Sequence, residues 1–300
     1  MDFNFSVGHG ADVTVNYILD NFTPALDAIA AVIGFVTGGI QGLLVGIPPV
    51  AGIAILTILS LWRVGWKFAV FAVAALLLIG GMGLWERMME TLSLVLAATG
   101  IAILIGVPLG IAMARSNVVQ MVARPVLDLM QTMPAFVYLI PAAMFFGLGA
   151  VPGTIATVIF AMPPVVRLTN LGIRQVHSEF IEAGLAFGCT PMQLLLKVQV
   201  PNALPSIMAG INQTIMLSLS MVVIASMIGA GGLGNTVLTG IQRLDVGTGF
   251  EGGLAVVVLA VLLDRITQSF GQKRAPSGLR ALFARRSEGA AQQPAVVSKA

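Results

Sequence analysis

Charged residues are scarce in this 300-residue chain, at 10% of the sequence against 57% for hydrophobic residues. Soluble domains carry roughly 25% charged residues, so these charges are too few to cover a water-exposed surface. The mean hydropathy of +0.95 leads to the same conclusion. The composition therefore predicts an all-α membrane protein rather than a soluble domain.

Residues that support catalysis or metal binding are also few. The one cysteine, Cys189, excludes an intramolecular disulfide, and His9 and His177 lack metal-ligand spacing. The sequence contains no phosphate-binding loop of the Gly-x-x-x-x-Gly-Lys-Ser/Thr type. A glycine-rich run at 229–234 follows an apolar stretch, where a sharp helix exit explains it better than a nucleotide site. We therefore expect a protein that is not an enzyme and binds no cofactor and no nucleic acid.

Seven stretches of mostly apolar residues approach the length of about 20 residues that a membrane span requires. Prolines interrupt the fourth and fifth stretches. We expect broken or tilted helices there, enclosed by protein or by a water-filled cavity near a path. The expected spans are Gly46–Trp62, Phe68–Trp85, Leu92–Ala114, Ala135–Leu148, Gly153–Val166, Ile207–Ile228 and Leu254–Phe270.

The two ends of the chain differ from the transmembrane domain, which we place at 46–270. Residues 1–45 form a separate segment, in which apolar residues recur every three or four positions between Asp12 and Gly42. This pattern predicts an amphipathic helix on the outer membrane surface or against the other helices, with a partly buried eighth span as the alternative. Residues 271–300 are polar and basic, which is typical of a disordered cytoplasmic tail that can touch anionic lipid.

Basic residues fall mainly on one side of this arrangement. With the tail in the cytoplasm, most of the 16 Lys and Arg residues lie in cytoplasmic segments, and the outer segments hold Arg87 and Arg243. Positive charge favours the cytoplasmic side of a membrane protein. The charge distribution predicts a multi-pass protein of the bacterial inner membrane whose N-terminus is outside.

The cytoplasmic connection that we expect at 167–205 carries the most specific pattern, formed by Glu182-Ala183-Gly184, Gly188 and Val198-Gln199-Val200-Pro201. Residues 179–185 suit a short helix that ends near Gly188. Thr190 and Pro191 suit the start of a second helix, which we expect to end before Pro201. Two short helices joined by glycine can fit a groove on a partner and transmit rigid-body motion.

This pattern resembles the coupling motif of binding-protein-dependent ABC importer permeases: Glu-Ala-Ala, three residues, Gly, nine residues, Ile-x-Leu-Pro. Every fixed position agrees in spacing, and Gly184, Val198 and Val200 stand in place of Ala, Ile and Leu. The resemblance extends to the permeases of glycine betaine/proline-type importers, the quaternary-amine uptake class, through the segments Asp128–Tyr138, Asn212–Thr214 and Ser220–Ile228.

The resemblance implies a type I ABC importer fold. It also implies a permease homodimer, two ATPase subunits that bind the ATP, and a periplasmic substrate-binding protein. The implied substrate is a betaine-class osmolyte or amine such as glycine betaine, proline, choline or trimethylamine N-oxide. The residues that would couple the permease to its ATPase are Glu182, Ala183, Gly184, Gly188, Val198, Val200 and Pro201.

Polar residues inside apolar spans are costly and mark candidate substrate contacts, although hydrogen bonding between helices is an alternative role. The candidates are Gln131, Thr132, Tyr138, Asn212, Gln213 and Thr214. With three Trp and two Tyr, no aromatic cage for an ammonium group is visible, so recognition is expected on the binding protein. An ion-coupled secondary transporter of small amines is the alternative. It would require a mid-span carboxylate or an inverted repeat, and we find neither.

Overall fold

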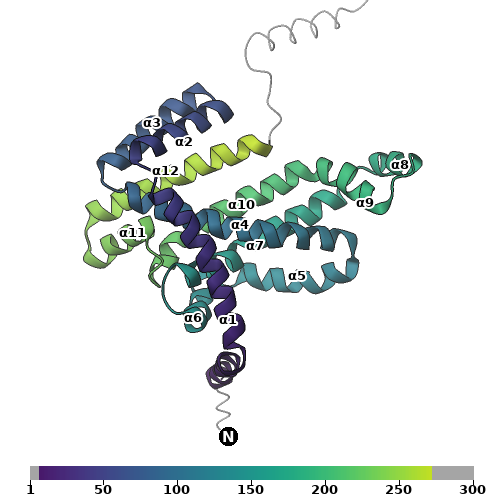
Figure 1. The fold of residues 1–300 in the computed structure, drawn as a ribbon. Coiled ribbons are helices and arrows are strands. Elements are labelled where there is room, and N and C mark those ends of the chain that lie inside the picture. The colour runs from purple at the N-terminus through teal and green to yellow at the C-terminus, as the bar shows by residue number, and fades with distance from the viewer. Residues whose placement is uncertain (1–6, 272–300) are drawn as a thin grey trace, which may run out of the picture.

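The computed structural model describes residues 7–271, and all regular structure in that range is helical (Figure 1). Five helices are long and apolar enough to cross a membrane, judged by length and composition. Four belong wholly or mainly to the predicted transmembrane domain, and α1 precedes it. They are α1 (Val7–Val45), α4 (Trp85–Arg115), α7 (Ala150–Arg174), α10 (Val200–Ser226) and α12 (Val246–Gly271). The all-α membrane fold is thereby confirmed, whereas the predicted tail lies outside the described residues.

Shorter helices fill the rest of the described chain. They are α2 (Pro49–Arg63), α3 (Trp66–Gly81), α5 (Asn117–Thr132), α6 (Ala135–Phe146), α8 (Ser178–Ala186), α9 (Pro191–Leu194) and α11 (Gly232–Arg243). The predicted spans at 46–62 and 68–85 correspond to α2 and α3, which have 15 and 16 residues. Such helices rise only about 23 Å, less than a hydrocarbon core of about 30 Å. The count of long spans is therefore five, or six if the bent pair α5 and α6 forms one.

The first helix, α1, confirms the helix expected between residues 12 and 42 and extends it at both ends. Its part from Val13 to Val45 is long and apolar enough to span a membrane. Figure 1 shows α1 running across the other long helices rather than alongside them, and it packs against α4, α6 and α7. This placement agrees with the expectation of a helix against the other helices, and its length and composition also agree with the alternative of a further span.

Proline separates two helices at one of the places where we expected a broken or tilted helix, and at another place the helix continues through it. Pro134 separates α5 from α6, whose directions differ by 101°. Pro163 and Pro164 instead lie inside α7, which is continuous over 25 residues. The fifth predicted span is therefore not broken, so of the broken or tilted helix expected there only the tilted form remains. Both prolines are buried, and the packing of neighbouring helices keeps α7 continuous although proline removes backbone donors.

The centre of the bundle is the packing of α7 against α4 and α10. A Cβ added at Gly110 of α4 would lie 2.6 Å from the Val166 carbonyl oxygen of α7. A Cβ added at Gly210 of α10 would lie 3.0 Å from the Val165 Cα atom. Small residues allow backbones to approach closely where lipid supplies no hydrophobic driving force between helices. Glycine on both neighbours thus fixes the position of α7.

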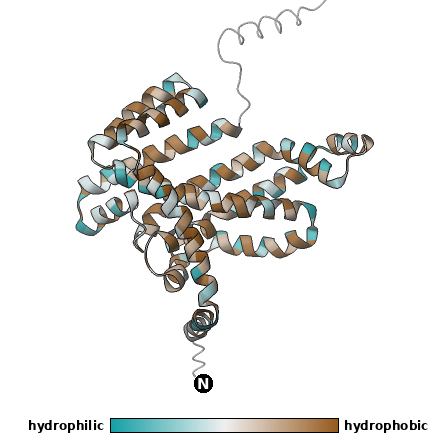
Figure 2. Ribbon diagram, viewed as in Figure 1, coloured by the Kyte–Doolittle hydropathy of each residue, from teal (hydrophilic) through white to brown (hydrophobic). Residues whose placement is uncertain are grey.

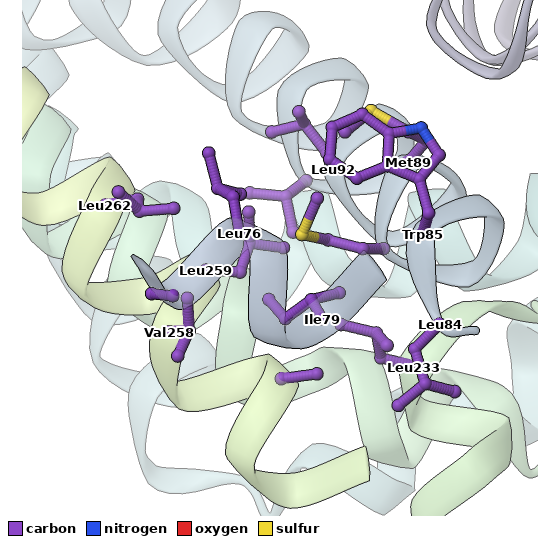
Figure 3. Close-up of a cluster of buried hydrophobic side chains, with 14 of the residues drawn as sticks. Leu76, Ile79, Leu84, Trp85, Met89, Leu92, Leu233, Val258, Leu259 and Leu262 are labelled. Atoms are coloured by element: carbon purple, nitrogen blue, oxygen red, sulfur yellow. The ribbon is translucent and has the colours of Figure 1, made fainter. Parts of the chain in front are cut away.

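A second core joins α3, α4, α11 and α12 (Figure 3). Leu76 and Ile79 of α3 are fully buried and lie between α4 and α12. Trp85, at the start of α4, packs in the same cluster and fills the space beside Gly52 of α2. Figure 2 shows that hydrophobic residues run along most of the bundle, with hydrophilic residues gathered at the α4–α5 turn and around α11.

We expect Gly110→Ala to destabilise the folded subunit, because the added methyl group would collide with the backbone of α7. Overpacking typically costs about 1–3 kcal/mol. Gly100→Ala on the same helix is the matched control, since a Cβ there meets nothing within 4 Å. Thermal unfolding in detergent micelles measures both variants. Equal unfolding midpoints would contradict the close approach of α4 and α7.

Candidate functional site

Two short helices project from one end of the bundle between α7 and α10 (Figure 1). They lie within residues 175–199, which we call the protruding element. It consists of α8, a turn, α9 and a π-helical turn, Leu195–Gln199, that leads into α10. The connection predicted at 167–205 is shorter than expected, because α7 continues to Arg174 and α10 begins at Val200.

The turn between the two short helices has the predicted geometry. Gly188 has a φ of +76°, which a residue with a side chain adopts only under strain. The Thr190 backbone N–H donates to Gln193 Oε1 at 2.9 Å, and the Gln193 backbone N–H donates to Thr190 Oγ at 3.4 Å. This reciprocal pair is a capping box. The predicted short helix ending near Gly188 and the start of the second helix at Thr190 and Pro191 are both confirmed.

The second helix does not end before Pro201, contrary to the prediction. It continues as one helix from Pro191 to Ser226. The wider π-helical turn precedes the proline, with the Val200 N–H bonded to the Leu195 carbonyl. A π turn accommodates a ring that would clash with the preceding turn of a regular α-helix. The protruding element is therefore continuous with a membrane-length helix.

Three of the predicted coupling residues hold the protruding element together. Gly184 is buried, and a Cβ added there would lie 2.7 Å from Leu194 Cδ1 and 3.6 Å from Val198 Cγ2. Glycine in place of the alanine of the motif thus makes room for Leu194. Val200 packs against a core formed by Ile173, Leu195, Ala203 and Ile207. The contacts of Gly184 fasten α8 to α9 and the π-helical turn, and Val200 anchors the start of α10 in the core.

The other predicted coupling residues, Glu182, Ala183, Gly188 and Pro201, are exposed. Beside them lie large apolar side chains that the sequence analysis missed. Phe187 is 89% exposed, and the neighbouring exposed residues are Phe180, Leu185 and Met192. The sequence did carry a signal for them, because apolar residues stand next to glutamates in and beside the short helix expected at 179–185. Exposed apolar patches with a polar rim are typical of surfaces that bind a protein, a membrane or a ligand.

The six polar path candidates divide by exposure. Tyr138 and Thr214 are buried and donate to backbone carbonyls, those of Met130 at 2.7 Å and Gly210 at 3.0 Å. Asn212 is half-buried and joins α10 to α12, where it donates to Asp264 Oδ1 at 2.9 Å and accepts from Thr267 Oγ at 2.9 Å. These three side chains therefore hold the fold together.

The remaining candidates, Gln131, Thr132 and Gln213, are exposed. Gln131 and Thr132 end α5 beside its sharp bend, and Thr132 donates to the Leu129 carbonyl at 3.2 Å. Gln213 lies on α10 next to Asn212. Their side chains are accessible to a solute, unlike those of the buried candidates.

The glycine-rich run at 229–234 forms the sharp helix exit that we expected. Gly229, Gly231 and Gly232 all have positive φ angles. The Gly232 backbone N–H donates to Glu90 Oε2 at 2.9 Å, and the Leu233 N–H donates to Thr91 Oγ at 2.8 Å. Side chains of α4 thus occupy the N-terminus of α11. These two hydrogen bonds join α4 to α11 and satisfy backbone N–H groups at the start of α11.

These features define a class: a helical membrane subunit with a protruding helical element that exposes apolar side chains. Residues 106–275 match the family model described as binding-protein-dependent transport system inner membrane component. The chain belongs to this family and is an inner-membrane permease of an ABC transporter. Family membership confirms the permease prediction over the ion-coupled alternative.

Similar proteins extend this assignment over nearly the whole chain. The glycine betaine/carnitine transport permease GbuB of Listeria monocytogenes is 53% identical over 85% of this chain and 92% of its own. The glycine betaine/proline betaine permease ProW of Escherichia coli is 48% identical over 89% of this chain and 75% of its own. A chain from the inward-facing MetNI methionine ABC transporter has a TM-score of 0.53 and 25% identity, covering 63% of this chain and 92% of that one. The type I ABC importer fold is confirmed.

We expect Thr190→Ala to loosen the second helix of the protruding element, because it removes the hydroxyl that caps that helix. Loss of such a cap costs typically about 1 kcal/mol. Thr190→Ser keeps the hydroxyl and is the control. Hydrogen exchange of backbone amides in residues 191–199 measures the effect. Equal exchange rates in the two variants would show that the capping box does not stabilise this element.

Proposed function

We propose that this chain is the permease of an ATP-driven importer of betaine-class osmolytes, such as glycine betaine, proline, choline or trimethylamine N-oxide. The observation that carries the proposal is the identity of about half to permeases named for glycine betaine, over most of both chains. The small number of Trp and Tyr residues supports delivery by a periplasmic binding protein that performs the recognition. The permease then offers a weakly polar passage.

The proposed partners are two ATPase subunits, a second copy of this permease and the surrounding lipid. The sequence contains no phosphate-binding loop, so the ATPase subunits bind and hydrolyse the ATP. Their docking surface is the tip of the protruding element, where Glu182, Ala183 and Gly188 are exposed beside Phe187, together with the exposed Pro201 at the start of α10. Gly184, Val198 and Val200 make the element rigid enough to pass on motion.

We infer that the protruding element lies in the cytoplasm and that the N-terminus is outside. Basic side chains support this orientation by meeting at helix ends. Arg63 donates to the Ser269 carbonyl at the end of α12, at 2.9 Å. Arg174, beside the protruding element, donates to the Met113 carbonyl at the end of α4, at 2.8 Å. Positive charge concentrates at cytoplasmic ends of spans.

Uptake into proteoliposomes tests the proposed function. The permease is reconstituted with its ATPase and binding protein, and labelled glycine betaine, proline, choline and trimethylamine N-oxide are supplied with and without ATP. We expect uptake that requires ATP and all three components. Uptake by this chain alone, driven by an ion gradient, would overturn the proposal.

We expect Glu182→Lys and Gly188→Trp to abolish ATP-driven uptake while the subunit stays inserted in the membrane. The first reverses an exposed charge on the proposed ATPase-binding face, and the second places a bulky residue at a φ of +76°. Glu251→Lys makes the same charge reversal at an exposed position of α12, away from the protruding element, and should preserve uptake. Normal uptake by both variants would refute the coupling role.

A further inference from the structure

Polar side chains form a row along the whole of α5. Asn117, Gln120, Arg124, Asp128 and Gln131 recur every three or four positions, so they share one face of the helix. All but Gln120 are exposed. The first four border a surface hollow of about 430 Å³. We call these five residues the polar row.

The polar row presents charges of both signs. Asp128 forms an ion pair with Arg167 of α7, and their side chains remain 53% and 39% exposed. Among residues 7–271, Arg124 has no hydrogen-bond or ion-pair partner. A small zwitterion moving along this face would therefore meet a free cation for its carboxylate and a partly neutralised anion for its ammonium group.

The neighbouring face of α5 has the opposite character. Val118, Val122 and Val126 are all more than half exposed. Together with residues of α4 and α7 they line an apolar hollow of about 410 Å³. Hydrocarbon suits such a surface, whereas it excludes arginine and aspartate. The two exposed faces of α5 therefore require two different surroundings.

The position of α5 beside the apolar helices α4 and α7 indicates which surroundings its polar face requires. Leu127 is buried in a cluster that includes Val166 and Met162 of α7 and Leu109 of α4, all inside the two helices that are long and apolar enough to cross a membrane. The 16 residues of α5 rise about 24 Å, most of the thickness of a hydrocarbon core. Charged side chains at membrane depth face a water-filled cavity or the bundle interior rather than lipid.

From these observations we infer that the polar row lines the inner part of the substrate passage, in which water and a small zwitterion pass Arg124 and Asp128. The identity of the substrate rests on the proposed function, as does the second copy of the permease that would close the passage. The claim that water reaches the polar row depends only on the residues of this chain. The two parts are therefore separable by experiment.

Cysteine labelling tests the inference in the assembled transporter. Gln120→Cys and Gln131→Cys place a thiol in the polar row, and Val118→Cys and Val122→Cys place matched thiols on the apolar face of the same helix. A charged, membrane-impermeant methanethiosulfonate reagent is applied in inside-out vesicles. Peptide-resolved mass spectrometry separates each site from Cys189, the one native cysteine. ATP-driven uptake is measured on the same preparations.

We expect the polar row to react at least about tenfold faster than the apolar face, because apolar surroundings disfavour the reactive thiolate. A compound that the uptake assay shows to be transported should slow the reaction of the polar row. Equal labelling of both faces, no labelling of the polar row, or labelling unaffected by a transported compound would each overturn the inference. Absence of uptake with face-selective labelling would refute the proposed function and leave the wetted row established.

Discussion

The close contact of α7 with α4 and α10 is the constraint on which the rest of the structure depends. In a bilayer the hydrophobic effect does not drive one apolar helix onto another, so the contact relies on backbones that approach closely. Gly110 and Gly210 permit this approach on the two sides of α7. The same packing keeps α7 continuous through Pro163 and Pro164, since neighbouring groups compensate for the missing donors.

The central packing also determines how the protruding element can act. α7 enters the element and the helix from Pro191 to Ser226 leaves it, so both of its ends are part of the core. The element itself is short, but Gly184, Leu194 and Val198 bind its two helices together. A push on the exposed face of α8 would therefore reach the bundle as movement of whole helices rather than being lost in a flexible loop.

The bend at Pro134 has a different consequence. Because α6 turns away from α5, α5 stays beside α4 and α7 while its two other faces remain uncovered. One of these faces is apolar, and the other carries the polar row. A single copy of the chain thus leaves the charged side chains of α5 exposed, as the proposed passage between two copies requires. The exposed Gln131 and Thr132 lie at the C-terminal end of α5, next to the bend.

Local patterns in the sequence determined the helical fold, the glycine turn at Gly188, the cap at Thr190 and the class of transporter, because each depends on residues that are close together in the chain. Tertiary structure decided the rest. Pro201 lies inside a helix because a π turn precedes it, and Asn212 bonds to Asp264 across 52 positions. Neither the packing that keeps proline in a helix nor the partner of a polar side chain can be read from spacing alone, since both depend on which helices become neighbours.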